Sequence, residues 1–306
     1  VPQAGRGHEA GVTVACTSTP VRGLEQLPLT RTTLDSGLVF HHVEAGAGAP
    51  LVFVHGVLGD WRTWAPQWHA FTPHFRCISY SRRYSVPNGN RQPSPHHSAL
   101  DEAADLQALL GAWGAAPAVL VGASYGGYTA LALAADRPEL VRALVLVEPP
   151  LMRLADTLPL GRQTRKDFDR SIRLPARDAF EQGDDARGVW LLTEGILGRA
   201  DLSQLPPAAM ARRLENAESL RRLTLSSDEF PALDMVRLAA LRAPVLLLSG
   251  ERTPPIHDAV FRSLSQALPQ AECHKVPEAG HGVARDAPAR FNALALDFLA
   301  RQGLAP

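Results

Sequence analysis

The stretch that decides the fold is Gly122-Ala123-Ser124-Tyr125-Gly126, a G-x-S-x-G motif. It follows the apolar run AVLV at 118–121 and precedes a run of small residues, TALALAA, at 129–135. This order predicts a strand, a sharp turn and a helix, which is the context that gives the motif its meaning. Glycines in the turn have no Cβ atoms to clash with neighbouring backbone, so the Ser124 hydroxyl can stand above the sheet edge. Ser124 is therefore a candidate nucleophile, and the Tyr125 N–H is a candidate oxyanion donor.

The size and net charge of the chain exclude some classes of binding partner. The chain has 306 residues, of which 45% are hydrophobic, and its 31 basic and 31 acidic residues give a formal net charge of zero. A neutral chain creates no long-range field that would recruit nucleic acid or an anionic membrane. We therefore expect a small, largely uncharged substrate and no nucleic-acid partner. No apolar run reaches the ~18 residues that a membrane span needs.

Neither the N-terminal residues nor the cysteines indicate a cellular location. Residues 1–11 contain Arg6, His8 and Glu9, so they do not form the apolar region of a signal peptide. We expect no signal peptide in this chain, and the sequence does not decide between cytoplasm and export, nor whether the chain forms a homodimer. Cys77 and Cys273 stand in apolar, strand-like runs, which predicts buried, unreactive thiols.

Apolar strands and amphipathic helices alternate along most of the chain. This alternation predicts an α/β fold with a parallel sheet covered on both faces, whose ligands bind beyond the carboxyl ends of the strands. We expect an irregular N-terminal arm over 1–28, a core made of 29–150 and 241–306, and a helical cap over 151–240. Strands are predicted at 38–43, 50–54, 75–80, 118–121, 141–147, 244–249 and 271–276, and core helices at 61–71, 98–113, 125–136, 256–267 and 287–301.

The predicted cap has no clear strand. Helical patterns cover 164–173, 185–198, 207–224 and 232–240. Most of its large apolar residues have the spacing of a cap core, and we predict that Trp190 lines a substrate pocket.

His281 is the candidate base for Ser124. A serine hydroxyl needs a base within hydrogen-bonding reach, and the base needs an acid to orient it. Gly280-His281-Gly282 follows the last predicted strand and precedes the last helix, so the loop should present the imidazole at the strand ends. His257 and the other histidines have no such placement and no zinc-type ligand spacing, so they are expected on the surface or in packing.

The loop after the strand at 50–54 begins His55-Gly56-Val57. A second oxyanion donor should come from this loop, and the Val57 N–H is the candidate. We expect His55 to organise the loop beside the substrate rather than to transfer protons.

Together these motifs resemble the α/β-hydrolase superfamily. The resemblance covers about 30–150 and 240–303, including the segments LVEP at 146–149 and LSGE at 248–251. It implies a mostly parallel eight-stranded sheet with helices on both faces and a helical cap inserted after strand six. It also implies a Ser-His-acid triad, no cofactor and no metal.

Two segments depart from the pattern of the family. The family often has D-x-R-G after the strand at 75–80, whereas this chain has SRRY at 81–84, which would bring Tyr84 close to the substrate. The triad acid usually stands in G-x-x-D after the strand at 244–249, but here the motif ends in Thr253. Some members take the acid from the end of strand six, which favours Glu148. Asp258, Glu251 or the lack of a working acid stay open as alternatives.

The sequence therefore predicts a serine hydrolase that cleaves carboxylic esters or lactones through an acyl-enzyme. Epoxide and haloalkane hydrolysis on this fold use an aspartate nucleophile, and Ser124 occupies that place. Two alternatives stay open: a non-hydrolytic ligand-binding or receptor-like homologue, and a C–C bond hydrolase or a cofactor-free oxygen enzyme with a Ser-His pair.

Overall fold

The computed structural model describes residues 22–198, 202–203 and 205–304. Its centre is an eight-stranded sheet in the order β1-β2-β4-β3-β5-β6-β7-β8. Strands β3 to β8 run parallel, whereas β1 and β2 pair antiparallel with their neighbours. The strands are β1 (Thr30–Thr33), β2 (Val39–Ala45), β3 (Pro50–Val54), β4 (Arg76–Tyr80), β5 (Ala118–Ala123), β6 (Val141–Val147), β7 (Val245–Gly250) and β8 (Glu272–Val276).

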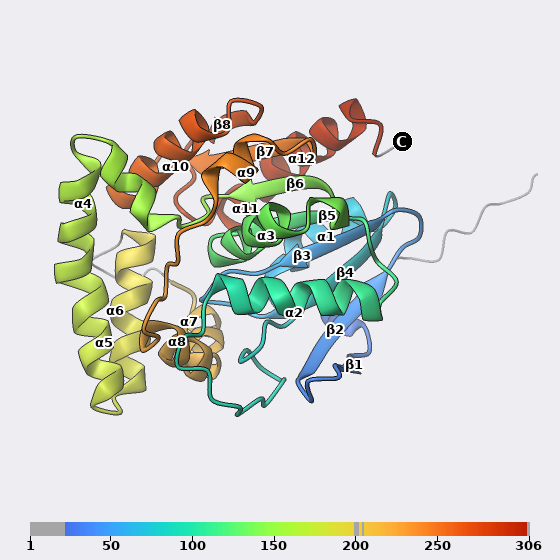
Figure 1. Ribbon diagram of the computed structural model, residues 1–306. Helices are drawn as coiled ribbons and strands as arrows, with labels where there is room; N and C mark the ends of the chain where they lie inside the picture. The colour runs from blue at the N-terminus through green and yellow to red at the C-terminus, as the bar shows by residue number, and fades with distance from the viewer. Residues whose placement is uncertain (1–21, 199–201, 204, 305–306) are drawn as a thin grey trace, which may run out of the picture.

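Helices cover both faces of this sheet, as predicted (Figure 1). The central strands are apolar on both sides, so successive residues of β5 enter opposite layers. Leu120 belongs to the cluster that includes residues of α2, α3 and α10, and Val121 belongs to the cluster that includes residues of α1 and α12. These helices are α1 (Ala65–Phe71), α2 (Ala99–Ala112), α3 (Tyr125–Asp136), α10 (Pro255–Ala267), α11 (Val283–Asp286) and α12 (Pro288–Arg301).

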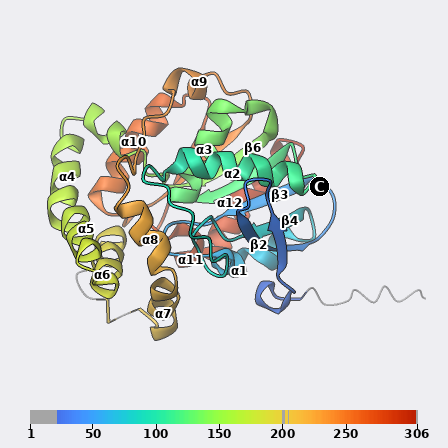
Figure 2. The same ribbon diagram turned by 60° about the horizontal axis from the view of Figure 1, so that its bottom comes forward.

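The segment between β6 and β7 contains helices and no strand among its described residues. Most of these helices, α4 to α8, gather on one side of the molecule, beyond the carboxyl ends of the strands (Figures 1 and 2), whereas α9 packs against α3. Phe180, Val189 and Leu220 form a small core of their own within this segment. The helices are α4 (Gly161–Phe168), α5 (Leu174–Glu181), α6 (Asp185–Leu197), α7 (Pro207–Glu215), α8 (Ala217–Thr224) and α9 (Met235–Ala239), and a π-helical turn (Asp169–Arg173) joins α4 to α5.

Two features differ from the sequence-based expectation. Strand β1 was not predicted, because its residues Thr30–Thr33 are polar and mostly exposed at the sheet edge. Cys273 is exposed, so the prediction of a buried thiol was wrong; β8 is the other edge strand and turns this side chain outward, whereas Cys77 is buried in β4. The predicted arm over 1–28 falls mainly on residues 1–21, which lie outside the described residues. Within the described part of the chain, no helix is long and apolar enough to cross a membrane.

Candidate active site

Ser124 occupies a strained turn between β5 and α3. Its backbone has φ 51° and ψ −123°, a region that non-glycine residues rarely adopt, and its N–H donates to the Val147 carbonyl at 2.7 Å. The turn depends on close backbone contact, because a Cβ atom on Gly126 would lie 2.1 Å from the Val54 carbonyl oxygen. The side chain is thereby held at the carboxyl edge of the sheet, at the start of α3.

The two backbone donors proposed for an oxyanion lie beside this turn. Tyr125 is the first residue of α3, so its N–H has no acceptor within the helix. Val57 stands in the loop after β3, and a Cβ on its neighbour Gly56 would lie 3.2 Å from the Ser124 Cβ. Within the described part of the chain, neither N–H donates a hydrogen bond, so both are available to an anionic oxygen.

His281 lies at the carboxyl edge of the sheet, in the loop between β8 and α11. The loop packs directly on β7, since a Cβ on Gly250 would lie 2.2 Å from the Gly280 carbonyl oxygen. The imidazole is buried, and its Nδ1 lies 2.6 Å from Glu148 Oε2. Its Nε2 is buried and makes no hydrogen bond with any described residue. This nitrogen is therefore the one available to a hydroxyl group.

Glu148 follows β6 and is 2% exposed. Its φ of 41° turns the chain sharply and directs the carboxylate toward β7 and His281. Oε1 accepts hydrogen bonds from Ser249 Oγ at 2.7 Å and from the Gly250 N–H at 2.8 Å, and Oε2 accepts one from Thr253 Oγ1 at 2.7 Å. Burial alone would favour the neutral acid, but these donors and His281 lower the pKa of Glu148 to about 2. The group is a carboxylate at neutral pH.

The alternative acids point elsewhere. Asp258 forms ion pairs with Arg262 and Lys275, and Glu251 is exposed and accepts the Glu278 N–H at 3.2 Å. Neither contacts His281. Thr253, which replaces the family's aspartate, is a site residue that the sequence reasoning missed: its hydroxyl supports the same carboxylate oxygen that holds His281.

Two cavities meet at Ser124. The large cavity, of about 450 Å³, is lined by Ser124, Val57 and His281, and it is the more open of the two. The small cavity, of about 40 Å³, is lined by Ser124, Val57 and Tyr125 and continues under the helices between β6 and β7. No hydrogen bond joins Ser124 Oγ to His281 Nε2 in the described chain, although both residues line the large cavity. Such contacts are often long without substrate and tighten in the complex.

His55 lies beneath the loop that carries Val57. Its Nδ1 donates to the Gly56 carbonyl at 2.8 Å, and its Nε2 accepts the Arg82 N–H at 3.0 Å, which fixes a neutral tautomer. Burial, with the nearby Arg82 charge, lowers the pKa of His55 to about 4. The ring therefore braces the loop as a neutral group.

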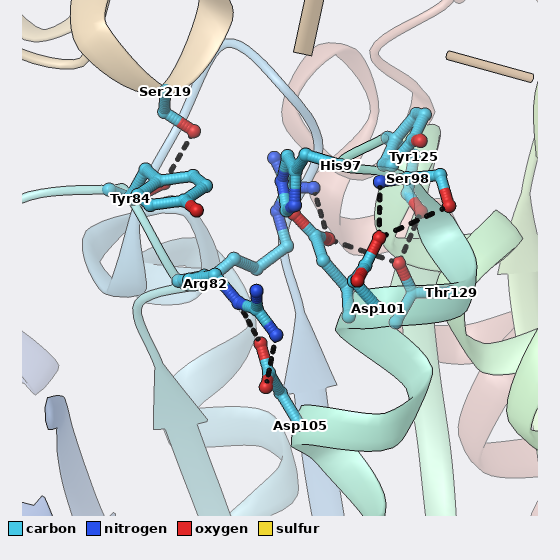
Figure 3. A network of polar contacts seen from close by, with 12 residues as sticks. Arg82, Tyr84, His97, Ser98, Asp101, Asp105, Tyr125, Thr129 and Ser219 are labelled. Atoms are coloured by element: carbon cyan, nitrogen blue, oxygen red, sulfur yellow. Dashed lines mark hydrogen bonds and ion pairs between the residues drawn. The ribbon is translucent and has the colours of Figure 1, made fainter. Parts of the chain in front are cut away.

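A buried ionic network connects this loop to α3 (Figure 3). Glu102 on α2 accepts from Arg82 at 2.5 Å, from His97 at 3.1 Å and from Thr129 at 3.2 Å. The Arg82 guanidinium also lies 5.3 Å from the centre of the Tyr125 ring. Burial opposes charge on Glu102, but Arg82 and His97 lower its pKa to about 2. The ion pair therefore links the segment after β4 to the serine turn.

The three residues predicted to line the substrate pocket do not line either cavity. His55 is fully buried below the loop, and Tyr84 donates its hydroxyl to the Gln92 carbonyl at 2.8 Å while packing on His97. Trp190 is 46% exposed. It was placed wrongly because α6 turns Val189 and Leu192 inward, which leaves Trp190 on the outer face of the helix.

His257 is a further residue of the site. It lies in the first turn of α10, is 3% exposed and stacks on His281 with ring centres 3.9 Å apart and planes 23° apart. Burial, with the neighbouring His281, lowers the pKa of His257 to about 3, so the ring is neutral. The sequence signal was its place at the start of a helix that begins at the carboxyl edge of the sheet.

Glu148, His257 and His281 form the one cluster in the described chain whose ligand atoms lie close enough for a metal ion, within 4.8 Å of one another. The arrangement does not suit a metal, because nearly parallel stacked rings direct their nitrogen lone pairs side by side rather than toward one point. Glu148 also already accepts hydrogen bonds on both oxygens.

Comparison with known proteins identifies the family of this fold. The family model of the alpha/beta hydrolase fold matches residues 49–288. A mouse protein named sn-1-specific diacylglycerol lipase ABHD11 is 27% identical over 293 residues, covering 90% of this chain and 87% of its own. A Caulobacter sp. (strain K31) protein named as a carbamate hydrolase, RutD, is 27% identical over 285 residues, covering 87% of this chain and 98% of its own.

Solved structures share the fold. The carboxylesterase CesB from Bacillus subtilis superposes with a TM-score of 0.68 at 21% identity, covering 92% of each chain. Est816, described as an N-acyl homoserine lactone degrading enzyme, gives a TM-score of 0.69 at 22% identity, covering 88% of this chain and all of its own (100%). The match of the family model across most of the chain, on the predicted sheet, establishes that the protein belongs to the α/β-hydrolase-fold family and is a hydrolase of that type.

Proposed function

We propose that the protein is a serine hydrolase that cleaves carboxylic esters or lactones through an acyl-enzyme. The observation that carries the proposal is the buried Glu148–His281 pair: His281 lines the same cavity as Ser124, and its Nε2 has no partner among the described residues. The lipase, carboxylesterase and lactone-degrading relatives support an ester or lactone as the substrate.

In the first half of the reaction, Ser124 Oγ attacks the carbonyl carbon and gives its proton to His281 Nε2. The Val57 and Tyr125 N–H groups stabilise the oxyanion of the tetrahedral intermediate. The intermediate then collapses, its bond to the alcohol oxygen breaks, and His281 returns the proton to that oxygen. Glu148 holds the Nδ1–H tautomer and stabilises the imidazolium that forms between these steps.

In the second half, water attacks the acyl carbon and gives a proton to His281. The bond to Ser124 Oγ breaks, this oxygen takes the proton back, and the carboxylic acid leaves. With a lactone the alcohol and acid are one molecule, so a hydroxy acid is released.

The two cavities support a division of the substrate. His281 must reach the leaving oxygen, and it lines the large cavity but not the small one. The alcohol portion therefore occupies the large cavity, and the acyl portion occupies the small one. The small cavity has about 40 Å³, and since one water-sized sphere needs roughly 10–15 Å³, it holds about three non-hydrogen atoms. Short acyl groups are expected to react fastest.

The test is the hydrolysis of p-nitrophenyl esters with acyl chains of two to eight carbons. We expect turnover with a preference for short chains, and a loss of at least about 10³-fold in kcat for Ser124→Ala. Ser36→Ala, in the exposed turn between β1 and β2, is the matched control and should match the wild type. A wild-type protein with no turnover, or a Ser124→Ala variant with full turnover, would favour the non-hydrolytic alternative or another nucleophile.

A further inference from the structure

The small cavity contains two buried polar groups that the proposed chemistry does not use. Glu229 Oε2 is inaccessible to solvent and makes no hydrogen bond with any described residue. His257 is also buried, and the Ile196 carbonyl lies within reach of one of its ring nitrogens, so the other ring nitrogen has no partner among the described residues. The rest of the wall is largely apolar and includes Leu192, Leu223 and Phe230. Buried polar atoms without partners are rare in folded proteins and call for an explanation.

Glu229 is held firmly beside the serine turn. Its backbone carbonyl accepts the Tyr125 hydroxyl at 2.7 Å, and the ring of the next residue, Phe230, packs edge-on against the Tyr125 ring at 6.0 Å. The carboxyl group is thus fixed relative to the residue after Ser124. Its place in the cavity does not arise from a loose surface loop.

The charged side chains near Glu229 form no hydrogen bond with its carboxyl group. Arg173 pairs with Asp169, and Arg177 pairs with Glu181 and donates to the carbonyls of residues 224–226. Both guanidinium groups act on the Glu229 carboxyl from a distance without a hydrogen bond to it. Burial dominates and raises the pKa of Glu229 to about 8. At neutral pH the group is a carboxylic acid, which can both donate and accept a hydrogen bond.

Resting on the proposed function, we propose that the small cavity selects a short acyl group that carries a hydroxyl, about three atoms beyond the carbonyl carbon, which Glu229 and His257 bind. A hydroxyl is a donor and an acceptor, so it complements a neutral carboxyl and a neutral imidazole together. An ammonium group fits less well, because the apolar wall would desolvate its charge and Arg173 and Arg177 lie near. An alkyl chain would leave the Glu229 carboxyl and one His257 nitrogen unpaired.

The size of the preference follows from this pairing. A site built to bind a hydroxyl rejects an analogue without it, because the buried polar groups of the site are then left unsatisfied. For one neutral hydroxyl in a small cavity we expect a preference of about 10- to 100-fold in kcat/KM.

Three p-nitrophenyl esters of equal chain length test the proposal. They carry 3-hydroxypropionyl, butyryl and 3-aminopropionyl groups, which differ only in the terminal atom. The wild type should favour the hydroxyl ester over the butyryl ester by about 10-fold or more. Glu229→Leu should reduce the ratio to within about threefold, whereas Glu229→Gln, which keeps a donor and an acceptor, should retain most of it.

The outcomes separate this inference from the proposed function. Equal kcat/KM values for hydroxyl and butyryl esters in the wild type, or a ratio that Glu229→Leu leaves unchanged, would overturn the hydroxyl subsite while ester hydrolysis stands. A preference for the aminopropionyl ester would overturn the choice of a hydroxyl. Turnover of none of the three would overturn the proposed function, and the subsite with it. If Glu229→Leu fails to fold, the wild-type ratio of kcat/KM for the hydroxyl and butyryl esters still tests the hydroxyl subsite.

Discussion

Replacement of Glu148 by glutamine tests the proposed orienting acid. Glutamine keeps the shape of the side chain but removes the charge and replaces one acceptor oxygen by a donor. In the wild type, one carboxylate oxygen accepts from Ser249 Oγ and the Gly250 N–H, and the other accepts from Thr253 and His281. The amide nitrogen of glutamine can replace either oxygen. In one orientation the amide NH₂ faces the Gly250 N–H, which cannot accept a hydrogen bond. In the other orientation it donates to His281 Nδ1 and favours the tautomer that has its proton on Nε2. Both orientations remove the charge that stabilises the imidazolium.

The expected loss follows from this geometry. An imidazole that loses its orienting carboxylate costs on the order of 10⁴ in kcat. Thr253→Ala is the matched comparison, because it removes one of four donors around the same carboxylate and leaves the charge and His281 in place. We expect it to lower kcat by about 10-fold or less.

The assay is steady-state hydrolysis of the best p-nitrophenyl ester, with circular dichroism to verify folding of each variant. Ser36→Ala serves again as the control variant, with the kcat of the wild type expected. The reasoning is refuted if Glu148→Gln retains kcat within about 10-fold of the wild type, or if Thr253→Ala loses more than Glu148→Gln.

Four further predictions follow from individual contacts. Glu148→Gln/Thr253→Asp should recover at least about 10-fold in kcat over Glu148→Gln alone, because the Thr253 hydroxyl lies 2.7 Å from the oxygen that holds His281. Glu102→Gln should lower the free energy of unfolding by about 3–5 kcal/mol in urea titrations, because it leaves a buried guanidinium without its carboxylate; a loss below about 1 kcal/mol would contradict this. The pKa of Glu229, about 8, lies above its ordinary value of 4.5, so its contribution to stability is complete below pH 4.5 and is lost as pH rises through 8. Thermal unfolding from pH 5 to 8 should therefore show the wild type losing stability relative to Glu229→Gln, by about 1.4 kcal/mol per pH unit at most, and parallel curves would contradict the burial of this carboxyl. Gly126→Ala should abolish soluble folded protein or catalysis, because its Cβ would meet a carbonyl oxygen at 2.1 Å, and a variant with native melting temperature and turnover would refute the close approach.

Much of the fold could be predicted because it follows from periodicity. The central strands are continuous apolar runs, and the helices between them show one apolar face, so seven of the strands and the α/β class were found. β1 lacked any such signal, since Thr30–Thr33 pairs through its backbone at an exposed edge. α5 was missed because Leu174-Pro175 reads as a break, whereas the proline occupies the first turn of the helix, where it needs no hydrogen-bond partner.

Some residues of the candidate site could likewise be predicted from the sequence, and others could not. Ser124 and His281 were found because glycine-rich turns at strand ends leave a mark in the sequence, and Glu148 was suggested by the threonine at position 253. The supporting hydroxyl of Thr253 could not be predicted, because it depends on how β6 and β7 align at their carboxyl ends.

The pocket was the part that the sequence predicted poorly. Trp190 was chosen for its residue type, but the docking of α6 on its neighbours decides which face turns inward, and that face carries Val189 and Leu192. Glu229 belongs to no motif and sits between helices, so only the fold places its carboxyl in the small cavity.

Labelling with a fluorophosphonate probe, mapped by mass spectrometry, tests the central claim most directly. Such probes react with a serine only when a base activates it, so the result depends on Ser124 and His281 together. The account predicts one labelled peptide, modified at Ser124, with labelling lost in Ser124→Ala and slowed in Glu148→Gln by a factor similar to the loss in kcat. An unlabelled wild-type protein, or a label on another residue that persists in Ser124→Ala, would contradict it.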